Sequence, residues 1–179
     1  MKYLSVIIIC LGLIACQSNP EEGKEVESLI TQLDSIQLNI QDINLDDLKS
    51  KKKKVLSITK ELEQTLTPDK VSKEDNIYTL SDYRFMKKPY GKMIDQYLSL
   101  TKEYEHRKKQ LLDLQYYVIH NKFETKEKMD AAILDETNRV KSAVKFSADL
   151  KKDYLKNEKE YHRLQTKVDS ILTIVRTSP

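Results

Sequence analysis

Two pairs of a carboxylate and a histidine are the residues whose types and spacing could hold a metal ion. Glu103 and His106 are three positions apart, the spacing with which helical bundles bind two iron or manganese ions. Glu158 and His162 are four positions apart, so this pair would also share one helix face. In the register derived below, the two pairs lie about 36 Å apart along the helices. We therefore expect exposed histidines and no metal site.

The residues needed for covalent or phosphate chemistry are scarce. A catalytic thiol or hydroxyl requires a nearby histidine and an orienting acid, and a phosphate site requires a glycine-rich loop. The chain has 3 glycines, none of which brackets a serine, and its 2 cysteines, Cys10 and Cys16, both lie near the N-terminus. We therefore expect a protein that is not an enzyme and that needs no cofactor.

The overall composition narrows the fold and the class of partner. Charged residues make up 33% of the chain and hydrophobic residues 39%, and the formal net charge of +3 is spread along the sequence. This balance produces no strong field for nucleic acid, and it argues against a disordered chain. With 3 glycines and 4 prolines there are few turns, which disfavours an all-β sandwich and a phosphate-binding α/β enzyme.

The N-terminal segment is typical of a secretory leader. Lys2 supplies a positive charge, and residues 4–15 are apolar apart from Ser5 and Gly12. As a helix this run would span about 18 Å, which is less than the ~30 Å hydrocarbon core of a bilayer. The pattern therefore predicts a signal peptide over residues 1–15 rather than a membrane-spanning helix.

The segment Leu13-Ile14-Ala15-Cys16 resembles the lipobox of bacterial lipoproteins. The resemblance implies that diacylglycerol alkylates the Cys16 thiol, that the leader is then cleaved, and that a fatty acid such as palmitate acylates the new amino group. Two or three acyl chains on one cysteine would anchor the protein almost permanently, at about 0.8 kcal/mol per buried CH₂. An ordinary secretory signal with an incidental cysteine is the alternative.

Residues 16–23 are polar and contain a proline and a glycine, which predicts a short tether before the folded part. Gln17 in place of an aspartate resembles the signal that lets enterobacterial lipoproteins travel to the outer membrane. Glu21 and Glu22 resemble the acidic export signal of surface lipoproteins in Bacteroidota. We therefore expect a location in the cell outer membrane, on the periplasmic or the surface side.

Apolar residues then recur at alternating steps of three and four, which predicts an all-α fold. We expect an elongated antiparallel helical bundle or coiled coil of three to four long helices over residues 24–179. The chain breaks this rhythm near Asn44, which can cap a helix that begins with acidic residues, although one continuous helix with a stutter is the alternative. The first row is Val26, Leu29, Leu33, Ile36, Ile40 and Ile43, and the second is Leu45, Leu48, Lys52, Val55, Thr59, Leu62 and Leu66.

Three further helices are expected after Thr67-Pro68-Asp69. A short helix falls within residues 69–88, Pro89 fits the first turn of a long helix, and a turn at residues 120–122 precedes the longest helix. The first long row is Tyr90, Met93, Tyr97, Leu100, Tyr104, Arg107, Leu111, Leu114 and Val118. The last row is Ile133, Glu136, Val140, Ala143, Ser147, Leu150, Tyr154, Asn157, Tyr161, Leu164, Val168, Ile171 and Val175.

A tight turn near residues 121–124 makes the last two helices antiparallel, so the numbers of facing residues total about 244. This register places Arg107 opposite Glu136, and we expect a pair that helps to fix the register while adding little stability. Residues beyond about 154 then need another partner, and we expect the row from Val26 to Ile43 to cover them.

A run of lysines from Lys49 to Lys54 is interrupted only by Ser50. It could bind anionic lipid headgroups, since each nearby lysine contributes about 1 kcal/mol. A solvated helix face balanced by nearby carboxylates is the alternative.

The region from about residue 83 to residue 150 is similar to small lysine-rich helical lipoproteins of Bacteroidota that have no assigned activity. The similarity lies in Gln110-Leu111-Leu112-Asp113-Leu114, in the turn at Asn121 and in Glu136 of the following helix. It implies a membrane location and a helical fold, and it identifies no functional residue.

These observations favour a lipid-anchored envelope protein whose helical bundle is a structural or protein-binding module. Its partners would be the membrane, through the lipid on Cys16, and a protein of the cell envelope. The alternative is a carrier or chaperone-like module that holds a lipid or an apolar peptide between its helices. A large apolar cavity would favour the carrier, and a tightly filled core would favour the first interpretation. The oligomeric state and the partner are left open.

Overall fold

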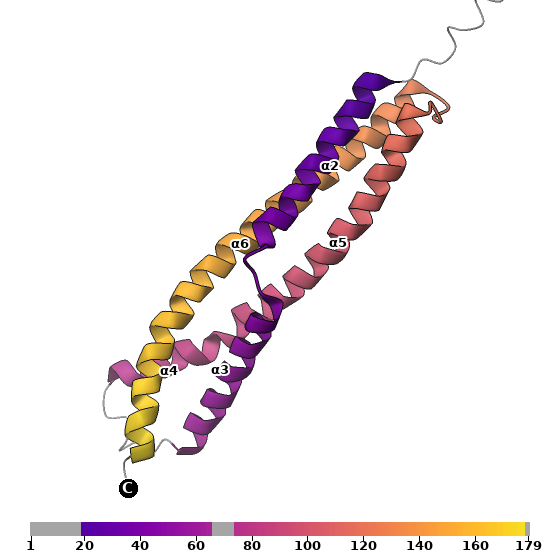
Figure 1. The fold of residues 1–179 in the computed structure, drawn as a ribbon. Coiled ribbons are helices and arrows are strands. Elements are labelled where there is room, and N and C mark those ends of the chain that lie inside the picture. The colour runs from indigo at the N-terminus through magenta and orange to yellow at the C-terminus, as the bar shows by residue number, and fades with distance from the viewer. Residues whose placement is uncertain (1–18, 66–73, 178–179) are drawn as a thin grey trace, which may run out of the picture. The chain divides into compact units, whose positions relative to one another are not determined.

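The computed structural model describes residues 19–65 and 74–177, which form α helices and no strand (Figure 1). The predicted all-α class is therefore confirmed. The leader, Cys16, Gln17, Leu66 and the Thr67-Pro68-Asp69 turn lie outside the described residues. In chain order the helices are α2 (Pro20–Ile40), α3 (Leu45–Thr65), α4 (Glu74–Phe85), α5 (Lys87–Ile119) and α6 (Lys126–Thr177).

The first described helix begins earlier than the sequence pattern predicted. Pro20 opens α2, so residues 20–23 are helical and the predicted tether over residues 16–23 is wrong for this part. Proline suits the first turn of a helix because its missing N–H has no partner there, and Glu21 and Glu22 favour the positive end of the helix dipole. Gly23 fits because α5 is close: a Cβ atom at this position would lie 3.3 Å from Cγ1 of Ile119.

The predicted break near Asn44 is confirmed, because α2 ends at Ile40 and α3 begins at Leu45. The Asn44 side chain caps α3: its Oδ1 accepts hydrogen bonds from the N–H groups of Asp46 at 2.9 Å and Asp47 at 3.0 Å. One continuous helix with a stutter is thereby excluded.

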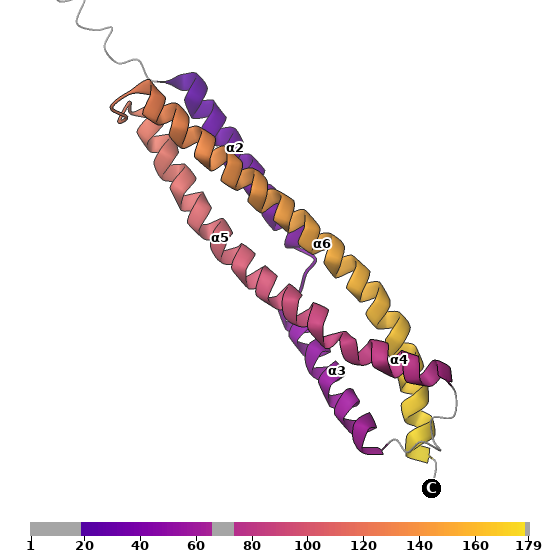
Figure 2. The ribbon, with the colours of Figure 1, turned by 180° about the vertical axis from the view of Figure 1, so that it is seen from behind.

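The described residues pack into two compact units. The first unit contains residues 19–35 and 104–144, and the second contains residues 36–65, 74–103 and 145–177. In the first unit α2 runs antiparallel to α5, with Asp34 beside Lys108, and parallel to α6, with Glu22 beside Lys126. Figures 1 and 2 show this part of α2 alongside α6 from opposite sides.

In the second unit, α6 again has one parallel and one antiparallel neighbour. Here α3 runs parallel to α6, as the pair of Glu61 with Arg176 shows together with the pair of Lys51 with Glu158. The beginning of α5 is antiparallel to α6, with Lys92 3.7 Å from Asp153. The predicted antiparallel arrangement of α5 and α6 therefore holds within each unit.

The predicted buried rows are largely confirmed in α2, α5 and α6. In α2 all six predicted positions are buried, and in α5 the row is buried from Tyr90 to Val118 except for the half-buried Tyr97. In α6 the row is buried except at three half-buried positions: Glu136, Tyr154 and Asn157.

The row of α3 was predicted correctly at Leu48, Val55 and Leu62, and two of its other positions were assigned one residue too late. Its buried positions are Leu48, Val55, Ile58 and Leu62, and Lys51 is half-buried in the same row. The predicted row contained Lys52 and Thr59 instead of Lys51 and Ile58. Burying isoleucine is more favourable than burying threonine, and the row that carries Ile58 also carries Lys51.

The prediction that the row from Val26 to Ile43 covers the end of α6 is wrong. The ring of Tyr161 stacks on that of Tyr83 with 6.3 Å between centroids, and it meets the Tyr90 ring edge-on at 5.6 Å. Near the C-terminus, Arg176 donates two hydrogen bonds to Glu61. This part of α6 is therefore covered by α3, α4 and the beginning of α5, because α4 continues the antiparallel row that α5 forms.

The cap of α3 leads to a first prediction. Replacing Asn44 by alanine removes the acceptor for two backbone N–H groups and should lower the free energy of unfolding by about 1 kcal/mol. Asn44→Asp keeps an acceptor at the cap and should differ little from the wild type. Urea unfolding followed by circular dichroism measures both variants. Equal stability of the alanine and aspartate variants would contradict the role of the cap.

Candidate functional site

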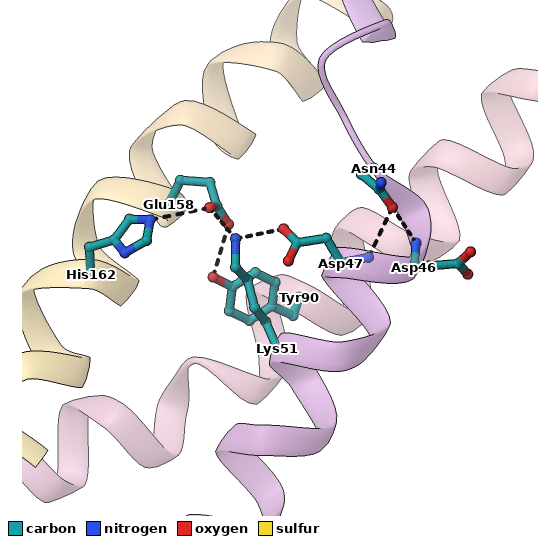
Figure 3. A network of polar contacts seen from close by, with 7 residues as sticks. All are labelled: Asn44, Asp46, Asp47, Lys51, Tyr90, Glu158 and His162. Atoms are coloured by element: carbon teal, nitrogen blue, oxygen red, sulfur yellow. Dashed lines mark hydrogen bonds and ion pairs between the residues drawn. The ribbon is translucent and has the colours of Figure 1, made fainter. Parts of the chain in front are cut away.

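A network of charged and polar side chains around Lys51 connects three helices of the second unit (Figure 3). The ammonium of Lys51, on α3, lies 2.6 Å from Oδ2 of Asp47 one turn earlier. It also donates a hydrogen bond to Oε2 of Glu158 on α6. The side chains of Lys51 and Glu158 are each only 15% exposed, so this ion pair is largely removed from water.

Glu158 joins three helices through its two carboxylate oxygens. The hydroxyl of Tyr90, on α5, donates a hydrogen bond of 3.1 Å to Oε1 of Glu158. On the other oxygen, Nε2 of His162 is 3.8 Å away. The Lys51 ammonium also lies 5.6 Å from the centroid of the Tyr161 ring, at the distance of a cation–π contact. A single carboxylate thus links α3, α5 and α6.

The protonation states of Lys51 and Tyr90 are fixed over the neutral pH range. Burial lowers the pKa of Lys51, but hydrogen bonds to Asp47 and Glu158 outweigh it, and the net effect is a raised pKa. Burial, followed by the charge of Glu158, raises the pKa of Tyr90 far above its usual range. The lysine therefore remains an ammonium and the tyrosine a neutral phenol. These two groups supply a fixed charge and an oriented hydrogen bond rather than a group that exchanges protons near pH 7.

A second buried chain of hydrogen bonds lies on the α4 side of the same rings. The hydroxyl of Tyr83 donates to Oε1 of Gln165 at 2.7 Å, and Nε2 of Gln165 donates to Oδ1 of Asp169 at 2.6 Å. Tyr83 is 1% exposed and Gln165 is 8% exposed. Burial raises the pKa of Tyr83, so its hydroxyl keeps the proton that it donates. The buried hydroxyl of Tyr83 and the buried amide of Gln165 thus have hydrogen-bond partners.

Sequence reasoning missed both of these arrangements. Lys51 lay outside the assigned row because that row started from Leu45, which is half-buried just after the break. Counting instead from Leu48 in steps of three and four leads to Lys51, Val55 and Ile58. Gln165 lies next to the row position Leu164, and the pattern of α6 alone offers no signal that α4 would cover it.

The two carboxylate–histidine pairs do not form a metal centre in the described residues, where no group of three potential ligands comes close enough to hold an ion. His106 and His162 are exposed, as the sequence analysis expects. His162 is 72% exposed although it reaches Glu158, whose carboxylate is directed to Lys51 and Tyr90.

The predicted partners Arg107 and Glu136 meet in the first unit. Nη1 of Arg107 lies 3.3 Å from Oε1 of Glu136, and it also donates to Oε1 of Gln110 at 2.7 Å. The side chains of Arg107 and Glu136 are 10% and 13% exposed. Oε2 of Glu136 is buried without a hydrogen-bond partner in the described chain, so the desolvation of this carboxylate is incompletely offset. This geometry supports a pair that contributes little to stability, and its effect on register stays a prediction.

The basic run of α3 is not a uniform cationic face. Lys51 is committed to the buried network, and Lys49 lies 3.4 Å from Asp46. Lys53 and Lys54 are exposed and line a groove of about 490 Å³ between α3 and α6. Acidic residues line the same groove, so its charge is mixed.

Comparison with known proteins found no matching family model, no matching curated sequence and no matching solved structure. Within residues 19–65 and 74–177, no helix combines the length and the apolar character needed to cross a membrane.

The first unit supplies a second prediction. Replacing both Arg107 and Glu136 by leucine should change the free energy of unfolding by less than about 1 kcal/mol, because desolvation offsets most of the attraction between the two charges. Arg107→Leu alone leaves a buried carboxylate without its cation and should cost about 3 kcal/mol. Denaturant unfolding of the single and double variants measures both values. A loss of several kcal/mol in the double variant would show that the pair is a major source of stability.

The Lys51 network supplies a third prediction. Lys51→Met removes the cation that separates two carboxylates and should lower the free energy of unfolding by about 3 kcal/mol at pH 7. Because its pKa is raised, the contribution of Lys51 is fully present below its unfolded-state pKa and is lost as pH rises through the folded-state pKa. The cost of Lys51→Met should therefore shrink at strongly alkaline pH.

Two further variants make this test specific. Lys53→Met changes an exposed lysine on the same helix and should alter stability by no more than about 0.5 kcal/mol. Adding Glu158→Gln to the Lys51→Met variant should recover part of the loss, because glutamine keeps an acceptor for Tyr90 and removes the unpaired charge. If Lys51→Met were as mild as Lys53→Met, the network would not hold the helices together.

Proposed function

We propose that this protein is a lipoprotein of the bacterial cell envelope, anchored through lipid on Cys16, with its helical bundle acting as a non-catalytic structural or protein-binding module. The observation that carries the proposal is the apolar leader that ends in Leu13-Ile14-Ala15-Cys16. A thiol at this position, preceded by a small residue and a short apolar run, is the substrate expected by the enzymes that attach diacylglycerol. The proposed location is the outer membrane.

The start of the folded part supports this proposal. The helix α2 begins at Pro20, four positions after Cys16. The three residue steps from Cys16 to Asn19 span at most about 11 Å when the chain is fully extended. A bundle attached so closely to an acylated cysteine would stay near the membrane surface, which suits a structural or docking role.

The chemistry of the polar sites supports the non-catalytic part of the proposal. Lys51 has a raised pKa and is held by two carboxylates, so it is poorly suited to act as a nucleophile or a general base. Tyr90 and Tyr83 direct their hydroxyl groups to other helices of the same unit. These groups are used for contacts between helices.

Exposed apolar side chains on the helices support a protein-binding role. In the first unit, Leu134 on α6 is 61% exposed and Leu112 on α5 is 49% exposed. Partner helices dock on exposed apolar side chains of this kind. The alternative carrier function would use a groove such as that between α3 and α4, which is lined by Leu62, Leu80 and Tyr83. Its volume of about 260 Å³ is below the roughly 300–1,000 Å³ typical of small-molecule sites. The larger groove of about 490 Å³ between α3 and α6 is lined mainly by charged residues rather than by an apolar wall, so we favour the first function.

The lipid anchor supplies a fourth prediction. Cells that express the wild-type protein and are fed a labelled fatty acid should incorporate the label into it, because Cys16 provides the thiol that is alkylated. Cys16→Ala should abolish the label. Gel analysis of the immunoprecipitated protein measures the incorporation.

Cys10→Ala is the matched control, since it removes the other thiol of the chain from within the leader. This variant should incorporate the label as the wild type does. Label in the Cys16→Ala variant, or none in the wild type, would end the proposal of a lipid anchor on Cys16.

A further inference from the structure

The turn between α5 and α6 carries a group of aromatic side chains, which we name the aromatic tip: Tyr116, Tyr117, His120 and Phe123. Tyr116 and Tyr117 are 55% and 50% exposed, although the buried row of α5 passes close by through Leu114 and Val118. Aromatic rings in water forgo a large favourable burial energy. A cluster of such rings at one end of a hairpin therefore indicates a contact surface.

The rings form a connected cluster that the turn holds in place. The centroids of Tyr116 and His120 are 4.3 Å apart, those of Tyr116 and Tyr117 are 6.0 Å apart, and those of Tyr117 and Phe123 are 6.3 Å apart. Asn121 adopts a positive φ of 48°, a conformation that asparagine tolerates. The N–H of Lys122 donates to the carbonyl of Tyr117 at 2.9 Å and closes the turn.

The same end of the first unit also holds the start of α2. Nδ2 of Asn19 lies 3.5 Å from Oδ1 of Asn121 and 3.5 Å from the sulfur of Met129. Both ribbon views show the beginning of α2 beside the turn between α5 and α6 (Figures 1 and 2). Since Cys16 is at most about 11 Å of chain away from Asn19, a lipid on Cys16 would bring a bilayer to this end of the unit.

We propose that the aromatic tip inserts into the headgroup region of the bilayer that the lipid on Cys16 enters. This inference rests on the proposed lipid anchor and specifies how the anchored unit meets the membrane. Tyrosine combines an apolar ring with a polar hydroxyl and is enriched at membrane–water interfaces for that reason. The headgroup layer is about 5–7 Å thick on each side of the bilayer, which is within the reach that the short connection allows.

The charged residues near the aromatic tip indicate that its rings, rather than its lysines, make the main contact with a membrane. Lys126 lies 2.8 Å from Glu22, and Lys128 forms an ion pair with Glu124. These two lysines are neutralised locally and add little attraction for anionic lipids, so the rings are the main contact that the tip offers to a bilayer. The expected ligand is therefore the headgroup region of a phospholipid bilayer. Vesicles of zwitterionic phosphatidylcholine should be sufficient for the contact.

The chain has no tryptophan, so single tryptophans can report on the contact. The lipidated full-length protein carrying Tyr117→Trp is reconstituted into phosphatidylcholine vesicles whose acyl chains are brominated near the glycerol. Leu134→Trp is the matched control, because Leu134 is 61% exposed and lies in the same unit, about 12 Å along α6 from its first residue. Bromine should quench the Tyr117→Trp emission at least about twofold more strongly than that of the control, since quenching falls steeply with depth.

The outcomes separate this inference from the proposed function. If both variants float with the vesicles but are quenched equally, the contact of the aromatic tip with the bilayer is overturned. The lipid anchor is left intact by this result. Failure of the wild-type protein to float with vesicles, at the same level as Cys16→Ala, would overturn both.

Discussion

The buried row of α6 is the constraint on which the rest of the structure depends. It extends over most of a 52-residue helix, and an apolar row of this length is stable in water only when other helices cover it. In the first unit α2 and α5 lie against it, and in the second unit α3, α4 and the beginning of α5 do so. The covering helices α2 and α3 are separated by the break that the Asn44 cap ends.

Each unit places one largely buried ion pair between α6 and a neighbouring helix. Arg107 meets Glu136 in the first unit, and Lys51 meets Glu158 in the second. Buried pairs of this kind gain little net stability, but a helix shifted by one turn would leave their charges unpaired at a large cost. Repeating apolar rows pair almost equally well in several registers, so we predict that the charged positions make one register preferable.

Much of this fold could be predicted because its signals are local. The steps of three and four identified the buried rows of α2, α5 and α6, and Asn44 followed by two aspartates identified the start of α3. The signals for Lys51 and for the covering of Tyr161 are not local. Whether Lys51 or Lys52 enters the core depends on which residue one turn later packs better, and the partner of Tyr161 depends on how the chain returns after α3. Periodicity in one helix contains neither piece of information.

In the proposed function, a lipid on Cys16 anchors the helical bundle to a membrane. The lysine and tyrosines of the module are held in defined states, and the start of its first described helix lies beside the aromatic end of the hairpin. The most direct test is mass spectrometry of the N-terminal peptide from the membrane fraction. The account predicts a peptide that begins at Cys16 and carries the mass of diacylglycerol. A peptide that continues from Ala15 through an unmodified Cys16 would contradict it.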